Sequence, residues 1–192
     1  MNCRDRMERE IIEDWRFSAN AIVKYKPKYY NKEGHYTREE WGAMSDIGET
    51  IGNHLVTPEE YFNTEQQYVK AVIELMKTTN CQYLTVFFMG DTPRSRKDSL
   101  KRLTSKKNRF LIYDKPLYET YVNLKEEKRI HISKIDQVVR LNLRGYTYTV
   151  LVNWKNYLEI RFSYDYYMYC NSRLNINILR QKINKIGLNV IR

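Results

Sequence analysis

Hydrophobic residues in the first 80 positions recur every three or four residues, which is the spacing of one face of an α-helix. This pattern predicts a helix over residues 5–25, where the apolar positions stop before Pro27, and a second helix over residues 38–52. Thr37 followed by Glu40 has the form of a capping box for the second helix. Residues 1–80 are therefore expected to be mainly helical.

The third predicted helix begins after Thr57 and ends near residue 79. Thr57 can accept a hydrogen bond from an early backbone amide, and Pro58 can occupy the first helical position, where no amide hydrogen bond is lost. Glu59 and Glu60 then place negative charge at the positive end of the helix dipole. This segment carries the strongest helix signal in the chain.

After residue 80 the hydrophobic period changes from about 3.6 to 2, which is the period of a β-strand. The predicted strands cover residues 83–89, 110–113, 139–143, 146–154 and 158–168, with a less regular segment over residues 117–124. Gly145 and Lys155-Asn156 occupy the positions where hairpin turns are needed. The alternation favours an antiparallel meander of about five to six strands with one buried face.

The last predicted element is a helix over residues 173–186, capped by Asn171 or Ser172 and ended by Gly187. Helices followed by strands and a final helix indicate an α+β fold rather than an alternating α/β fold. The 192 residues suit a single domain with its own core. Within it, residues 1–80 would be mainly helical, 81–170 mainly antiparallel sheet, and 171–192 the C-terminal helix.

Cysteine usage and hydropathy indicate a cytoplasmic protein. Cys3, Cys81 and Cys170 are odd in number and far apart, so we expect reduced thiols rather than a disulfide framework. The N-terminus has no apolar core of the kind that a signal peptide needs. The longest apolar run, residues 86–89, is far shorter than the roughly 20 residues of a membrane span. We therefore expect no membrane association.

The net charge of +10 is concentrated in one part of the chain. Residues 1–80 carry 11 basic and 14 acidic residues (−3), residues 81–130 carry 12 and 6 (+6), and residues 131–192 carry 10 and 3 (+7). The densest stretch, residues 94–109, has eight basic residues and one acid, Asp98. It is expected to form a loop or a short exposed helix between two strands.

Such a concentration of charge is typical of segments that bind phosphates or an acidic protein. The alternative is a solvated basic loop that serves solubility. The residues of this stretch that we expect to contact a partner are Arg94, Arg96, Lys97, Lys101, Arg102, Lys106 and Lys107.

The 17 tyrosines have a structural explanation, because most of the late ones fall on alternating strand positions, where their rings can fill the core. A platform for nucleic-acid bases would instead need two or three exposed aromatic side chains beside basic residues. Tyr167 and Tyr169, in line with Arg161 on the outward face, are the candidates for such a platform.

No catalytic, cofactor or metal site is expected from the motifs. His35, His54 and His131 lie far apart and outside any metal-binding spacing, and there is no glycine-rich phosphate loop. One pattern, Asp114 followed by Glu126-Glu127-Lys128, resembles the metal-binding core of restriction-type nucleases. Its alternative is a charged hairpin loop, which a chain with this many acids and lysines produces easily by chance.

Several short segments within about 35 of the 192 residues resemble the N-terminal region of immunity proteins of bacterial contact-dependent growth inhibition systems. They are Glu13-Asp14-Trp15, Lys24-Tyr25-Lys26-Pro27, Gly34 to Tyr36, Glu40-Trp41 and Ser45-Asp46-Ile47-Gly48. The resemblance implies a cytosolic, non-enzymatic protein that binds and blocks a cognate toxin domain. It implies no particular contact residue.

Three hypotheses follow. The first is an immunity or antitoxin-like protein that occludes the active site of a toxin, with the basic segment in the contact. A basic inhibitor implies an acidic face on the toxin, or binding through its own acidic helical region. The second is a nucleic-acid-binding protein that uses the same basic segment. The third is a metal-dependent nuclease that uses Asp114, Glu126 and Lys128.

Overall fold

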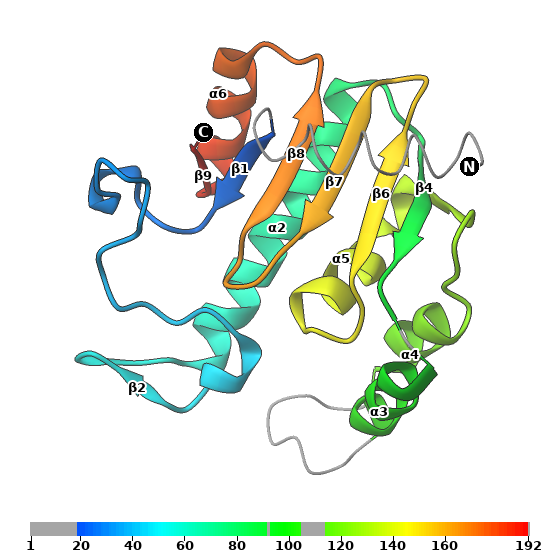
Figure 1. The fold of residues 1–192 in the computed structure, drawn as a ribbon, viewed down its shortest axis with the longest axis horizontal. Coiled ribbons are helices and arrows are strands. Elements are labelled where there is room, and N and C mark those ends of the chain that lie inside the picture. Colours follow the sequence, from blue (N-terminus) through cyan, green and yellow to red (C-terminus); the bar gives the residue numbers. More distant parts are fainter. Residues whose placement is uncertain (1–18, 92, 105–113, 192) are drawn as a thin grey trace.

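The computed structural model describes residues 19–91, 93–104 and 114–191, which form an antiparallel sheet and the helices packed on it (Figure 1). The helices are α2 (Pro58–Thr78), α3 (Pro93–Thr104), α4 (Lys115–Val122), α5 (Ile135–Leu143) and α6 (Ile176–Ile186). The strands of the sheet are β1 (Asn20–Val23), β4 (Tyr83–Met89), β5 (Arg129–His131), β6 (Thr149–Asn153), β7 (Leu158–Phe162), β8 (Met168–Ser172) and β9 (Asn189–Ile191). Three 3-10 helices, η1 (Pro27–Tyr29), η2 (Met44–Asp46) and η3 (Ile132–Lys134), and a separate hairpin, β2 (Thr50–Ile51) and β3 (His54–Leu55), complete the described elements.

The sheet has the strand order β5-β4-β6-β7-β8-β1-β9, and each neighbouring pair is antiparallel. Strands β6, β7 and β8 form a meander, while β1 lies between β8 and β9 and so joins the two ends of the described chain. Helices α2, α5 and α6 lie on one face of the sheet (Figure 1). The α+β class and the antiparallel sheet are confirmed.

The strongest local signals fold as expected. The Thr57 hydroxyl accepts from the Glu60 amide at 3.2 Å, and Pro58 opens α2. The turn between β6 and β7 falls at Lys155-Asn156, where the Asn156 amide donates to Asn153 Oδ1 at 3.0 Å. Gly187 ends α6 with a φ of 94°, a left-handed conformation that glycine adopts without a steric penalty.

The two helices predicted before residue 57 need correction. Residues 20–23 form β1, and residues 5–18 lie outside the described residues. Residues 38–52 form irregular backbone, η2 and β2 instead of a helix. Gly48 and Gly52 adopt φ values of 88° and 60°, which no α-helix contains, and Asp46 Oδ2 accepts the amides at 42 and 43 that a helix would direct elsewhere.

Two segments predicted as strands are helices. Residues 117–124 fall largely in α4, and residues 139–143 belong to α5. The buried positions of α5 begin with Ile135 and Val138, which precede the alternating segment and extend its pattern to the helical spacing. Gly145 therefore links a helix to β6 rather than two strands, and β6 begins at residue 149. The strand predicted over residues 110–113 lies outside the described residues.

The C-terminal third also departs from the prediction. Residues 158–168 form two strands, β7 and the start of β8, separated by a turn in which Asp165 and Tyr166 have positive φ values. Helix α6 is capped by Asn175 rather than by Asn171 or Ser172, because those two residues belong to β8. Residues 189–191 form an additional strand, β9.

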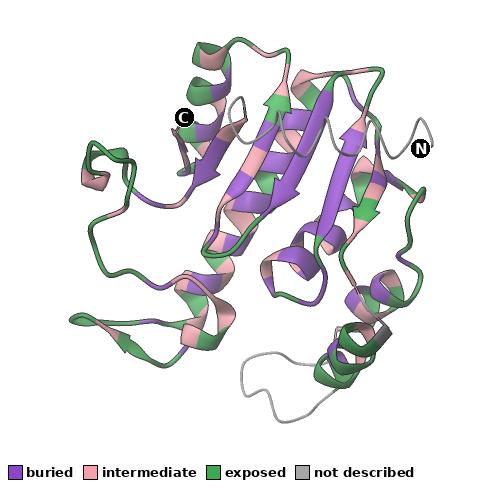
Figure 2. Cartoon of the chain, in the orientation of Figure 1, coloured by how far each residue is buried: buried purple, intermediate pink, exposed green. Residues whose placement is uncertain are grey.

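The sheet is more deeply buried than a meander with one solvated face. All five residues of β7 and four of the five in β6 are buried, as the purple strands in Figure 2 show. Glu159 and Arg161 alternate with the apolar residues of β7, and they neutralise each other in a buried ion pair. The prediction of one buried face is therefore wrong for β6 and β7.

None of the helices in the described residues has the length and apolar character to cross a bilayer.

A buried carboxylate joins α2 to α5. Glu65 on α2 has no exposed surface, and its two oxygens accept from Arg144 Nε at 2.7 Å and from Arg144 Nη2 at 2.8 Å. Arg140, one helical turn before Arg144, donates to the same carboxylate and also to Gln66 at 2.6 Å. The two arginines therefore hold the positions of both helices against the core.

We predict that Glu65→Gln lowers the free energy of unfolding by about 3–5 kcal/mol, because it leaves the buried Arg144 guanidinium without a counter-charge. Urea denaturation followed by circular dichroism measures the change. The matched control is Glu74→Gln on the same helix, whose ion pair with Lys182 is partly exposed and should contribute less than about 1 kcal/mol. Equal losses in the two variants would contradict the assigned role of Glu65.

Candidate functional site

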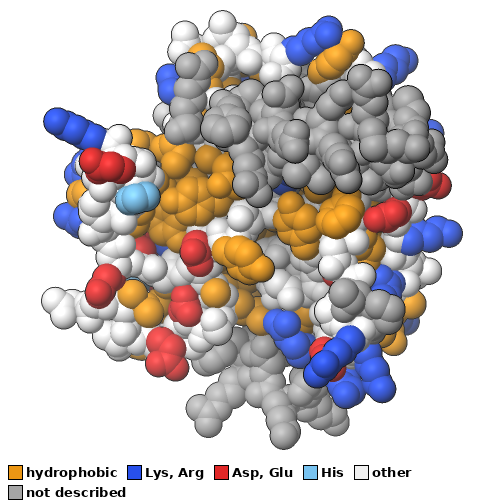
Figure 3. Space-filling model, in the orientation of Figure 1, with side chains coloured by type: hydrophobic (Ala, Val, Ile, Leu, Met, Phe, Trp, Pro, Cys, Tyr) orange, Lys and Arg blue, Asp and Glu red, His pale blue; other side chains and the backbone are white. Residues whose placement is uncertain are grey.

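Helix α3 carries the described part of the basic segment. Arg94, Lys97 and Lys101 are exposed and spaced three and four residues apart, so they share the outer face of the helix. We call these three side chains the basic ridge. Figure 3 shows basic side chains gathered over the region of α3. Lys106 and Lys107, which were expected to extend this surface, lie outside the described residues.

The other two predicted contact residues, Arg96 and Arg102, bind carbonyl groups within the chain. Arg96 Nη2 donates to the carbonyl groups of Tyr121 at 2.9 Å, Val122 at 3.0 Å and Leu124 at 3.2 Å, at the C-terminal end of α4. A cation at this end of a helix satisfies free carbonyls and the helix dipole. Arg96 therefore holds α3 against the end of α4.

Arg102 makes the equivalent contact with α5. Its guanidinium donates to the carbonyl groups of Gly145 at 3.3 Å and Arg144 at 3.4 Å, just after the helix ends. Ser99 adds a hydrogen bond of 2.8 Å to the Tyr146 carbonyl. Helix α3 is thus anchored to α4 by the half-buried Arg96 and to the residues after α5 by the buried Ser99 and the exposed Arg102, and this anchoring fixes the direction in which the basic ridge points.

Charge on the outer face of α3 is only partly balanced. Asp98 lies 3.9 Å from Lys101, and both side chains are more than half exposed. The outer face therefore carries three cationic side chains and one carboxylate. Water and salt screen such exposed charges, so the ridge acts over short distances.

The three residues of the nuclease-like pattern make separate local contacts. Asp114 caps α4 by accepting from the Leu117 amide at 3.1 Å. Glu126 Oε1 accepts from the Met89 amide at 3.1 Å, and Lys128 Nζ donates to the Asn123 carbonyl at 2.9 Å. In the part of the chain that the structure describes, no group of three or more His, Cys, Asp or Glu side chains could hold a metal ion.

Arg161 does not share an exposed surface with Tyr167 and Tyr169. It is 4% exposed and bound to Glu159. Tyr167 is half-buried, and its hydroxyl group forms a hydrogen bond of 2.8 Å with the hydroxyl group of Tyr30. The Tyr169 ring stacks on the Tyr167 ring, with the two ring centres 6.4 Å apart. The predicted platform is therefore corrected: these rings belong to a cluster at the β1 side of the sheet.

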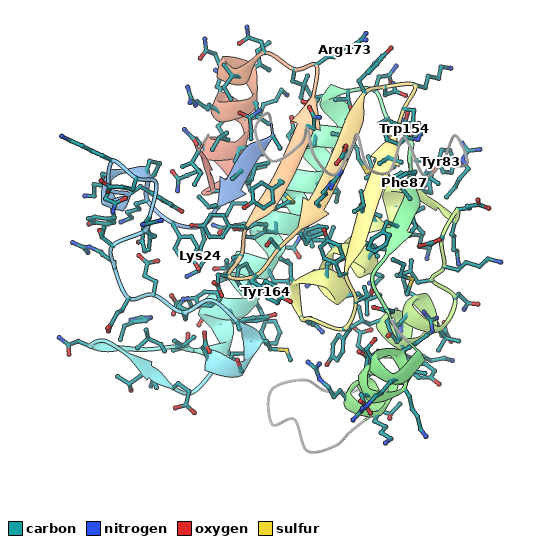
Figure 4. All side chains as sticks on the ribbon, in the orientation of Figure 1. Lys24, Tyr83, Phe87, Trp154, Tyr164 and Arg173 are labelled. Atoms are coloured by element: carbon teal, nitrogen blue, oxygen red, sulfur yellow. The ribbon has the colours of Figure 1, made fainter. Side chains whose placement is uncertain are left out.

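Exposed aromatic side chains do occur near the other edge of the sheet. Trp154, which is 52% exposed, contacts Phe87 edge-on at 5.5 Å, and Tyr83 contacts His131 at 4.9 Å. The Arg129 guanidinium lies 4.5 Å from the centre of the Tyr83 ring. Figure 4 shows Tyr83, Phe87 and Trp154 together around β4 and the end of β6. Sequence reasoning missed this group because its residues come from two strands, β4 and β5, and from the turn after β6.

A cavity of about 430 Å³ opens between the segment that follows β1 and the turn between β7 and β8. We call it the tyrosine pocket. Its lining residues are Tyr25, Tyr36, Arg38, Glu40, Gly42, Ala43, Asp46, Asp165 and Tyr167. The tyrosine excess was the signal that could have pointed to it, but the lining comes from segments more than 100 positions apart.

Lys24 lies beside this pocket and directly follows the last residue of β1. In Figure 4 it is labelled near Tyr164, which belongs to the turn between β7 and β8. Its side chain is 8% exposed, and Nζ lies 3.9 Å from the centre of the Trp41 ring and 3.6 Å from Glu40 Oε2. Burial lowers the pKa of Lys24 to about 8, and the attraction of Glu40 opposes this shift only in part.

Comparison with known proteins identifies no relative: no protein-family model, curated protein or solved structure matches the chain.

We predict that the contribution of Lys24 to stability depends on pH. Below pH 8 the lysine is protonated in both states, and the cost of burying its charge is fully present. As the pH rises from 8 towards 10.5, the folded state loses this proton before the unfolded state does, so stability rises. Relative to Lys24→Met, the wild-type free energy of unfolding should rise by about 2 kcal/mol between pH 7.5 and 9.5.

Urea titrations at four pH values measure this difference, and subtraction of the variant removes the titration of all other groups. Lys182→Met is the control, because Lys182 is partly exposed. A flat difference between wild type and Lys24→Met across this pH range would show that the ammonium group is not buried at a cost.

Proposed function

We propose that the chain is a non-enzymatic binding protein of the immunity or antitoxin type, which neutralises a cognate bacterial toxin domain by covering its active site. The observation that supports this proposal is the basic ridge, in which Arg94, Lys97 and Lys101 are exposed while hydrogen bonds of Arg96, Ser99 and Arg102 hold their helix in place. The proposed partner surface is acidic.

The anchoring of α3 matters because binding costs free energy when it orders a mobile surface. Here the helix is held in place before a partner arrives, and only the long outer side chains need to be ordered. Clustered charge of this kind increases the rate of association with a surface of opposite sign. The toxin class and the cytoplasmic location rest on the resemblance of the N-terminal segments to immunity proteins.

The proposal predicts that reversing the ridge charges abolishes protection. Cells that express the toxin domain encoded next to this chain should survive with the wild-type chain and die with Arg94→Glu/Lys97→Glu/Lys101→Glu. Co-purification of the two proteins should fall at least tenfold. The matched control is Lys70→Glu/Arg180→Glu/Lys185→Glu, which makes the same charge change at exposed positions of α2 and α6. Equal protection by both triple variants would remove the ridge from the contact.

A second candidate function, nucleic-acid binding, is favoured by one specific observation. Tyr83 and Trp154 are exposed aromatic rings, and the guanidinium group of Arg129 lies against the Tyr83 ring. Proteins that bind single-stranded nucleic acids combine such rings, on which bases stack, with basic side chains that contact the phosphates. A dodecamer of single-stranded DNA distinguishes the two functions. If the chain binds nucleic acid, its affinity for this DNA falls steeply as the salt concentration rises from 50 to 200 mM. The affinity also falls in the variant Trp154→Ala. The immunity proposal requires neither.

A further inference from the structure

Three tyrosines, Tyr25, Tyr36 and Tyr167, form the aromatic part of the lining of the tyrosine pocket. The centres of the Tyr25 and Tyr36 rings lie 4.7 Å apart, and the Tyr25 and Tyr167 rings lie 5.7 Å apart. Tyr30 packs behind Tyr36 at 5.1 Å, and its hydroxyl hydrogen-bonds that of Tyr167 at 2.8 Å. These contacts fix the rings relative to one another, so the wall is in place before a ligand binds. A pocket of about 430 Å³ falls within the size range of ligand sites.

Three carboxylates line the same pocket, and two of them have internal partners. Glu40 accepts from the Tyr36 hydroxyl and pairs with Lys24. Asp46 Oδ2 accepts from the amides of Gly42 at 2.8 Å and Ala43 at 3.0 Å. Asp165 is exposed and forms no salt bridge within the described part of the chain. Asp165 is therefore the carboxylate available to a ligand.

An unusual turn holds Asp165 in this position. Asp165 and Tyr166 have φ values of 55° and 59°, and both follow Tyr164 in the tight turn between β7 and β8. Aspartate tolerates this left-handed conformation, whereas a residue as bulky as tyrosine adopts it only when the surrounding structure requires it. Two consecutive left-handed residues are the geometry of a type I′ hairpin turn, so the β7–β8 hairpin itself sets the position of Asp165.

Burial of Tyr166 compensates for its strained backbone. Its ring packs against Trp41 at 5.2 Å and Tyr68 at 5.3 Å, and its carbonyl accepts from the Tyr68 hydroxyl. With Tyr166 held in this way, the Asp165 side chain lies next to Gly42. A methyl group in place of the glycine hydrogen would come within 3.0 Å of Asp165 Oδ1. The carboxylate and the pocket wall are therefore closely fitted.

The balance of charges favours a cation as ligand. Arg38 also lines the pocket, but its guanidinium lies 3.6 Å from the centre of the Tyr29 ring. Three carboxylates against Arg38 and the adjacent Lys24 leave one excess negative charge. Burial, with the negative charge of Asp165 as the next cause, raises the pKa of Tyr25 above its usual range. Aromatic walls with a free carboxylate are the usual surroundings of a bound guanidinium or ammonium group.

We propose that the tyrosine pocket binds a guanidinium or alkylammonium group, such as an arginine or lysine side chain, between its tyrosine rings and the Asp165 carboxylate. This site is separate from the basic ridge and does not depend on the proposed function.

Titration of the full chain with L-argininamide, followed by NMR shifts and calorimetry at 50 mM salt, tests the site. L-citrullinamide, the uncharged analogue of nearly the same shape, should bind at least tenfold more weakly. Asp165→Asn should lose at least tenfold in affinity for L-argininamide, and asparagine tolerates the same left-handed backbone. Asp98→Asn, which removes the same charge on α3, should bind as the wild type does.

Equal affinity for the two amides, or an equal loss in Asp165→Asn and Asp98→Asn, would overturn the proposal. A thermal melt of Asp165→Asn within a few degrees of the wild type shows that the loss is local. Gly42→Ala supplies a second variant, because its methyl group displaces Asp165 without changing charge, and it should also weaken binding. Tighter binding of the peptide Gly-Arg-Gly than of L-argininamide identifies a protein side chain as the ligand, and the reverse identifies a small molecule.

Discussion

The buried carboxylate of Glu65 is the constraint on which the arrangement of helices depends. A charge in a protein interior is tolerated only when its partners are in place, and Glu65 requires both Arg140 and Arg144. Since Arg140 lies on α5 and Arg144 directly follows its last residue, the ion pairs determine where that helix sits on α2. The carbonyl groups at the end of α5 then receive Arg102, so the position of α3 and its basic ridge follows from an interaction in the core.

The same end of α2 also supports the tyrosine pocket. Tyr61, one turn before Glu65, donates a long hydrogen bond of 3.5 Å to it and packs against Trp41 and Tyr166. Tyr166 in turn carries the turn that presents Asp165. Helix α3, which carries the ridge, lies away from the β7–β8 turn that carries Asp165, yet both are connected to the first half of α2 (Figure 1). A core substitution at Glu65 would accordingly disturb both surfaces.

Local signals in the sequence identified the elements whose stability is itself local. Helix α2 was predicted because its cap, proline and acidic first turn lie within four residues, and the β6–β7 hairpin because its turn and strands are adjacent. The strand predicted over residues 139–143 was wrong because Val139, Leu141 and Leu143 alternate like a strand when they are read alone. The helical spacing appears only when Ile135 and Val138, which precede the segment, are included. The helix predicted over residues 38–52 was wrong because the cap signal at Thr37 favours only the first turn, whereas Gly42, Gly48 and Gly52 disfavour a helix along the segment.

The candidate sites show the same division between local and distant information. The basic stretch could be found from the sequence, since its charges are consecutive, but the inward contacts of Arg96 and Arg102 depend on α4 and α5 and could not. The tyrosine pocket was invisible because Tyr25, Tyr36 and Asp165 meet only after β1 pairs with β8.

The two surfaces differ in how they respond to solvent, and this difference decides what each can contribute to recognition. The basic ridge is exposed, so at physiological salt its attraction fades beyond about 8 Å and acts mainly on encounter. Asp165 is also exposed, but it lies at a pocket that three tyrosine rings help to line, so a cation there would meet fixed rings as well as a charge. A partner drawn to the ridge by charge would therefore gain little selectivity from it. The cation site that we propose in the tyrosine pocket would select by shape as well as charge, and it would therefore be the better source of specificity.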